Sequence, residues 1–140
     1  MKAANVPLDR DQMEARLHSM LGRFFVTFAR IELNLSLRVG GKDSFAEKLK
    51  RLLALPLESG ESEELFCKIQ AWHKAADSLR DMRNLFAHGR WGYHVYMQQV
   101  IHVSGYPPAP QPERRFSLSE LDGIARDAEL LSEEFSQLGF

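Results

Sequence analysis

The sequence has a single cysteine, Cys67, among 140 residues, which excludes an internal disulfide bond and a cysteine-rich zinc site. Cys67 follows Phe66 in a helical pattern, which predicts a buried, unreactive thiol. No apolar run is long enough to span a bilayer. Residues 1–10 also lack the apolar core of a signal peptide. These absences predict a protein with no membrane segment, most simply a cytoplasmic one.

The chain also lacks an excess of basic residues. Its 18 Lys and Arg residues face 19 Asp and Glu residues, so the formal net charge is -1. This balance disfavours a general nucleic-acid coat, which usually carries a strong basic excess, but it leaves room for a small local basic site. The length and the 44% hydrophobic composition predict one domain, residues 1–140, with a substantial core.

Apolar residues at helical spacing predict four helices. The expected helices cover residues about 9–39, 44–55, 62–87 and from 117 onward. Gly40 ends the first helix, Ser44 caps the second, and Pro56 closes the second. Ser117 and Glu120 form a Ser-x-x-Glu capping box at the start of the last helix.

The helical period disappears between the third and last helices. Tyr93, Val100 and Val103 belong to a pattern that predicts two short strands within 91–103. Four prolines follow between 105 and 112, so residues 104–116 are predicted to form a loop. The predicted fold class is therefore all-α, a four-helix bundle with a small β-hairpin insert at about 91–103.

The residues of greatest chemical interest end the third helix: Arg83, Asn84 and His88 come just before Gly89. A guanidinium is a fixed cation and an imidazole exchanges a proton near neutral pH, and phosphate chemistry uses both groups. Arg83 also occupies a position in the apolar stripe, where a guanidinium needs an anion or other acceptors. The alternative is that His88 and Gly89 form an ordinary helix end, where the helix dipole favours a protonated histidine.

Glu32 is a second charged residue on an apolar helix face. We expect Glu32 and Arg83 to face each other, so that Glu32 orients the guanidinium and leaves donors for a phosphate. The alternative is a salt bridge that only fixes the helix register. Arg90 and Trp91 could extend a surface that binds and stacks on RNA, although a tryptophan there more often closes the edge of a core.

The segment Arg83-Asn84-x-x-x-His88 resembles the Arg-Asn-x-x-x-His form of the motif of HEPN domains. The surroundings are also similar: a long first helix with Phe-Ala-Arg-Ile-Glu-Leu at 28–33, a short second helix, and the motif at the end of the third. The last helix begins with Phe-Ser-Leu-Ser-Glu-Leu at 116–121. The resemblance covers nearly the whole chain and implies a HEPN-like helical bundle that is commonly a homodimer.

The resemblance further implies a metal-independent ribonuclease, often a toxin or a defence factor, without a cofactor. In that mechanism the ribose 2′-hydroxyl attacks the adjacent phosphate. His88 would act as general base or acid, Arg83 would stabilise the transition-state charge, and Asn84 would position His88 or the phosphate. Two protomers could supply two histidines, one for each proton transfer.

The sequence departs from this family at two places. Toxins paired with a nucleotidyltransferase antitoxin typically have a tyrosine two residues after the histidine, where this chain has Arg90. The strand-like insert is also foreign to the minimal bundle. A non-catalytic module that binds RNA, a nucleotide or a partner protein therefore remains an alternative, as does a purely structural dimer. The other histidines lack metal-ligand spacing, so no metal site is predicted.

Overall fold

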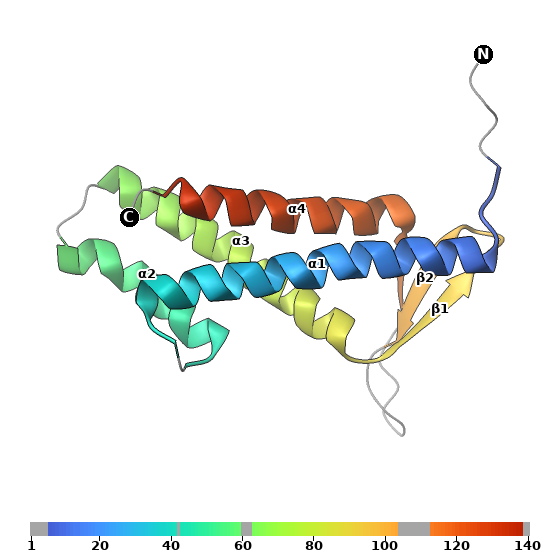
Figure 1. Cartoon of the computed structure of the whole chain (residues 1–140), viewed down its shortest axis with the longest axis horizontal. Helices are drawn as coiled ribbons and strands as arrows, with labels where there is room; N and C mark the ends of the chain where they lie inside the picture. The colour runs from blue at the N-terminus through green and yellow to red at the C-terminus, as the bar shows by residue number, and fades with distance from the viewer. Residues whose placement is uncertain (1–5, 42, 60–62, 104–112, 139–140) are drawn as a thin grey trace, which may run out of the picture.

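Four helices and a small antiparallel sheet make up the computed structural model, which describes residues 6–41, 43–59, 63–103 and 113–138 (Figure 1). The helices are α1 (Arg10–Val39), α2 (Phe45–Ser59), α3 (Glu63–Ala87) and α4 (Leu118–Ser136). The strands are β1 (Arg90–His94), β2 (Gln99–Val103) and β3 (Arg114–Ser117). The described chain is thus mostly helical, and no helix in it combines the length and apolar character needed to cross a membrane.

Local hydrogen bonds explain where α1 and α4, the two helices that run side by side, begin. At α1 the Asp9 side chain accepts from the Gln12 backbone N–H at 2.8 Å, and the Gln12 side chain accepts from the Asp9 N–H at 3.0 Å. The capping box predicted at α4 is confirmed, with the Glu120 N–H donating to Ser117 Oγ at 3.0 Å. Gly40 follows the end of α1 with φ +98°, a conformation that favours glycine.

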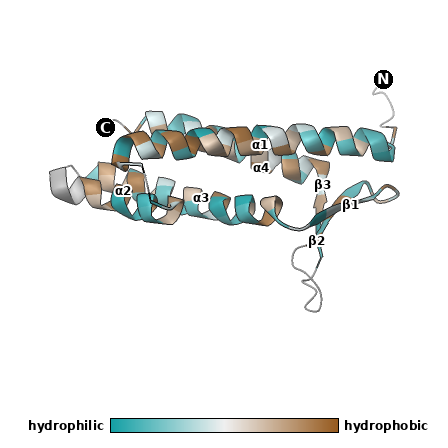
Figure 2. Cartoon of the chain, turned by 60° about the horizontal axis from the view of Figure 1, so that its bottom comes forward, coloured by the Kyte–Doolittle hydropathy of each residue, from teal (hydrophilic) through white to brown (hydrophobic). Residues whose placement is uncertain are grey.

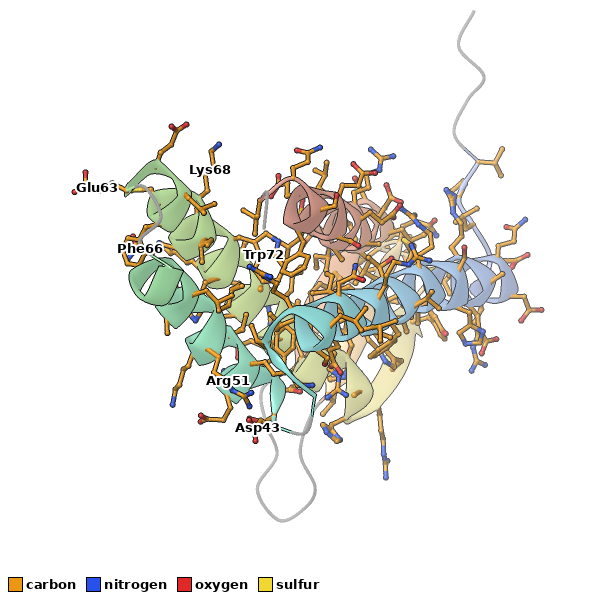
Figure 3. The ribbon with its side chains drawn as sticks, turned by 60° about the vertical axis from the view of Figure 1, so that its left-hand side comes forward. Asp43, Arg51, Glu63, Phe66, Lys68 and Trp72 are labelled. Atoms are coloured by element: carbon orange, nitrogen blue, oxygen red, sulfur yellow. The ribbon has the colours of Figure 1, made fainter. Side chains whose placement is uncertain are left out.

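The core lies where α1 and α4 run side by side and α3 crosses behind them (Figure 1). Trp72 points from α3 toward α4, and its Nε1–H donates to the Leu131 carbonyl oxygen at 2.9 Å, while Lys68 projects outward (Figure 3). Arg23 of α1 reaches Asp122 of α4 at 2.7 Å. Figure 2 shows hydrophobic and hydrophilic residues alternating along these helices, as one-sided burial requires.

Helix α2 is held to the end of α1 and differs from the prediction. The predicted second helix stops near Leu55, but α2 continues past Pro56 to Ser59. A proline removes one backbone hydrogen bond, and the residues beyond it can still donate to carbonyl groups before it. Arg51 of α2 pairs with Asp43 (Figure 3) and donates to the Val39 carbonyl oxygen at 2.8 Å.

The buried thiol predicted at position 67 is wrong. Cys67 is exposed, because it lies on the side of α3 turned away from the core residues Ile69 and Trp72. Its neighbour Phe66 is only half-buried. Adjacency to an aromatic residue therefore did not indicate which side of the helix faces the core.

The sheet confirms the predicted hairpin and adds a third strand. Strands β1 and β2 form the hairpin, and β3 pairs with β2, so that the order is β1-β2-β3 with both pairs antiparallel. The predicted loop 104–116 is therefore wrong for residues 114–116, which belong to β3, while 104–112 lie outside the described residues. Pairing with β2 explains why these residues form a strand, and the local pattern of apolar residues does not predict one.

One face of the sheet packs on the helices. Directly opposite residues of antiparallel strands share a face, so the pairs Trp91–His102 and Val100–Phe116 place these four side chains on the inner face. Val100 and His102 are fully buried, at 0% exposure. Phe86, in the last turn of α3, contacts both Trp91 and Phe116 and joins this face to the bundle.

Candidate functional site

The motif lies where α3 gives way to the first strand. Helix α3 ends at Ala87, so Arg83 is in its final turns and His88 lies just beyond it. The His88 N–H donates to the Leu85 carbonyl oxygen at 3.3 Å, which is the tighter spacing common at helix ends. Gly89 then has φ +102°, a conformation that favours glycine. The chain turns there and enters β1 at once.

Arg83 is unusual among the arginines of this chain. The half-buried arginines are Arg23, Arg51, Arg80 and Arg83. The first three form ion pairs with carboxylates, whereas the described residues provide Arg83 with none. Its guanidinium carbon lies 6.0 Å from the centre of the Phe28 ring, and Nη1 donates to Asn84 Oδ1 at 3.1 Å. Other guanidinium N–H groups therefore remain for an anion.

The structure does not form the ion pair expected between Glu32 and Arg83. Glu32 is half-buried on α1, and no hydrogen bond or ion pair joins the two side chains within the described residues. The ring of Phe28, one helical turn before Glu32, lies beside the guanidinium instead. The prediction placed both residues on inward faces, but the large ring of Phe28 takes the position next to Arg83.

Asn84 and His88 are both exposed. Asn84 contacts Arg83, and not His88, through the 3.1 Å hydrogen bond already described. On an ideal helix, five residues would separate Arg83 and His88 by roughly 140° of rotation, but His88 lies beyond the end of α3. The two groups therefore come from different parts of the chain, the last turns of α3 and the segment that follows it. No hydrogen bond joins their side chains within the described residues.

Trp91 closes the edge of the core, as the alternative interpretation of this residue expects. Its ring centre lies 5.5 Å from that of Phe86 and 6.2 Å from that of Phe116. Arg90, by contrast, is exposed and starts β1 two residues after His88. The two residues predicted to bind RNA therefore point to opposite faces of the strand, and only Arg90 faces outward.

His102 is a residue that the sequence did not single out for this site. Its imidazole is fully buried at 0% exposure, and neither ring nitrogen has a hydrogen-bond partner among the described residues. The ring meets Trp91 edge-on, with centres 4.6 Å apart. Burial lowers the pKa of His102, and the charge of Arg114 lowers it further. The His88 backbone carbonyl partly offsets this shift without reaching hydrogen-bond geometry.

Three shallow grooves of about 310 to 330 Å³ lie between helices, and none of these three is lined by Arg83, Asn84 or His88. One is lined by Lys68, Trp72 and Glu134 at the opposite end of α3. Within the described ranges, no group of three His, Cys, Asp or Glu side chains could hold a metal ion. Arg83, Asn84 and His88 therefore lie outside these three grooves, at a helix end where Asn84 and His88 are exposed.

Comparison with protein-family models, with curated protein sequences and with solved structures finds no match for this chain. The resemblance to HEPN domains consequently depends on the motif and on the order of the elements. Three observations characterise the site independently of that resemblance. Arg83 has no carboxylate partner among the described residues, an exposed histidine follows the helix end, and a strand that begins with Arg90 comes directly after it.

Proposed function

We propose that this chain is a HEPN-like protein that binds RNA at the end of α3 and cleaves it without a metal ion. The observation that carries the proposal is the state of Arg83, the one half-buried arginine without a carboxylate partner among the described residues. A guanidinium held by Phe28 and Asn84, with N–H groups left over, is suited to the oxygens of a phosphodiester.

The proposed reaction is an internal transesterification. The ribose 2′-oxygen attacks the adjacent phosphorus and loses its proton to a base, while the bond from phosphorus to the 5′-oxygen breaks and that oxygen gains a proton. The products are a 2′,3′-cyclic phosphate and a 5′-hydroxyl group. His88 performs one of the two proton transfers, solvent water performs the other, and Arg83 stabilises the charge on the phosphorane-like transition state. Asn84 holds the Arg83 guanidinium, because its amide oxygen accepts from Nη1.

A second candidate function is a module that binds RNA without cutting it. The observation that favours it is the setting of His88, which is exposed and whose ring has no hydrogen-bond partner within the described residues. A general base usually has a neighbouring group that fixes its orientation. In the binding module, Arg83 still contacts phosphate, but loss of the His88 imidazole has little effect.

The test incubates purified protein with mixed RNA in chelator and compares wild type with His88→Ala and Arg83→Ala. We expect cleavage by wild type and cyclic phosphate ends on the products. In both variants we expect the cleavage rate to fall by about 100-fold or more. His18→Ala is the matched control, because His18 is also exposed and has only a 3.9 Å contact with Glu14. Cleavage that survives both motif substitutions means the site is wrong, and binding without cleavage favours the second candidate.

The proposal includes a homodimer, for which α1 offers a surface. Val26, Leu33 and Leu37 are 61%, 58% and 77% exposed. Their spacing of seven and four residues places them on one side of α1, away from the buried Ile31 and Leu35. In a two-fold pair the same stripe serves both copies. Such a dimer leaves each motif on its own protomer, because the side of α1 that meets Arg83 is a different one.

Light scattering on the eluting protein tests this dimer. Leu33→Glu is expected to convert the dimer to a monomer, since a carboxylate would be buried without a partner. Leu130→Glu is the matched control, because Leu130 is an equally exposed leucine, at 54%, on α4. A wild-type monomer, or a dimer that survives Leu33→Glu, contradicts this assignment.

A further inference from the structure

The three strands contain no acidic residue. Their sequences are Arg-Trp-Gly-Tyr-His, Gln-Val-Ile-His-Val and Arg-Arg-Phe-Ser, which include three arginines and two histidines. The chain as a whole has slightly more acidic than basic residues. The sheet is therefore a local basic region that the overall net charge conceals, and it begins two residues after His88.

The strand register separates these residues into two faces. His102 lies opposite Trp91 and Arg114 and is fully buried, so this set faces the helices. The alternate residues face outward. We call the following set the outer sheet face: Arg90, Gly92, Ile101, Val103 and Arg115. A side-chain carbon added at Gly92 would meet nothing within 4 Å, which shows that no described element covers the centre of this face.

The two arginines of the outer sheet face lie on opposite edge strands. Arg90 is on β1 opposite Val103, and Arg115 is on β3 opposite Ile101. Two inter-strand spacings and an offset of two residues separate their backbone positions by roughly 12 Å. Two cations at this distance do not converge on one phosphate, but they can contact separate phosphates of a polymer. Val103, at 37% exposure, and the half-buried Ile101 form an apolar floor between them.

We propose that the outer sheet face binds single-stranded RNA and carries the strand onward from the end of α3. The inference rests on the proposed RNA function and names the form of the substrate. A single strand presents bases and riboses to an apolar floor while its phosphates reach cations on either side. A duplex keeps its bases paired and stacked inside the helix and so offers none to the apolar floor, which disfavours double-stranded RNA.

Arg115 already has a carboxylate neighbour, Glu113, at 3.1 Å. Both side chains of this pair are about half exposed, at 46% and 48%, and exposed pairs of this kind contribute little to stability. A phosphate can therefore replace the carboxylate. Arg90 is exposed and directly continues the motif, so the strand that reaches His88 meets Arg90 first and Arg115 afterwards.

Fluorescence anisotropy tests this inference with a labelled mixed-sequence single strand and the matching duplex, in chelator. The protein is the full chain with His88→Ala, which keeps the probe intact. Adding Arg90→Glu and Arg115→Glu is expected to weaken single-strand binding at least about tenfold and to reduce the slope of log K against log salt by roughly 1.4. Lys68→Glu with Lys74→Glu on α3 is the matched control, because it changes the net charge equally at two other exposed residues.

The inference is overturned if both charge-reversed pairs weaken binding equally, if the duplex binds as well as the single strand, or if no RNA binds. Circular dichroism confirms that each variant folds. The cleavage assay separates this inference from the proposed function. If cleavage depends on Arg83 and His88 but the substitutions in the sheet leave RNA binding unaffected, only the inference is refuted. Sheet-dependent RNA binding by a wild-type protein that cuts nothing refutes the proposed reaction alone.

Discussion

The three strands and α4 are close in sequence and carry opposite charge. The strands have three arginines and no carboxylate, whereas α4 has six carboxylates and one arginine. Two of those carboxylates, Asp122 and Glu129, pair with Arg23 of α1 and so help to hold the bundle together. Within the described residues, the arginines of the sheet make local contacts only: Arg114 lies 5.3 Å from the Phe116 ring centre, and Arg115 pairs with Glu113 beside it.

This difference shows why net charge is a weak guide to nucleic-acid binding in a chain of this kind. A formal charge of -1 arises here from an acidic helix and a basic sheet that lie in different parts of the molecule. A phosphate responds to the charges within about one Debye length, roughly 10 Å, and not to the sum over the chain. An RNA strand at the outer sheet face therefore meets a positive local charge, although the net charge of the protein is slightly negative.

The largest expected effect comes from separating the sheet from the bundle with Phe86→Ala. Phe86 is 5% exposed, and its ring centre lies 5.2 Å from that of Phe24 and 5.5 Å from that of Trp91. Removing a buried ring typically costs about 3–5 kcal/mol of unfolding free energy. We expect a loss of that size in urea unfolding, with hydrogen-exchange protection lost first in the strands and kept longest in α1 and α4.

The control for this prediction is Phe66→Ala on the same helix. Phe66 is half-buried near the other end of α3 (Figure 3), and its removal is expected to cost no more than about 1 kcal/mol. Equal costs for the two substitutions, or strands that stay protected in Phe86→Ala, would show that Phe86 does not anchor the sheet.

The helices could be predicted from the sequence because their signals are local. Apolar spacing and the capping residues Ser117 and Glu120 lie within a few positions of the structure they specify. Strand β3 could not be predicted in this way, because Arg114-Arg115-Phe116-Ser117 has a single apolar residue and depends on pairing with β2. Pro56 predicts the end of the second helix, but α2 includes this proline and ends three residues later, at Ser59.

The candidate site was predictable only in part. The helix position of Arg83 and the break at Gly89 follow from the sequence, but the neighbours of Arg83 do not. Spacing along α1 places Phe28 and Glu32 one turn apart, and only packing decides which of them lies beside the guanidinium. The sequence does not predict the state of His102 for a similar reason. Alternation along β2 indicates which face of the sheet His102 occupies, but not that its ring nitrogens lack hydrogen-bond partners among the described residues.

The smallest expected effect tests the buried histidine of the inner face through pH. Burial lowers the pKa of His102 below its ordinary value of 6.5, so the unfolded chain binds a proton more readily than the folded one. The contribution of neutral His102 to stability is therefore present above pH 6.5 and is lost as the pH falls toward the lowered pKa. Arg114 faces the ring from β3 and opposes its protonation.

His102→Phe should remove this dependence, because phenylalanine keeps an aromatic edge toward Trp91 and has no ring nitrogen to leave unpartnered. We expect the urea midpoint of the variant to fall less than that of wild type as the pH is lowered from 6.5, with little change above it. His18→Phe, at an exposed position, should retain the wild-type slope. A His102→Phe slope equal to that of wild type would mean that the buried imidazole is not the group whose protonation destabilises the fold in this range.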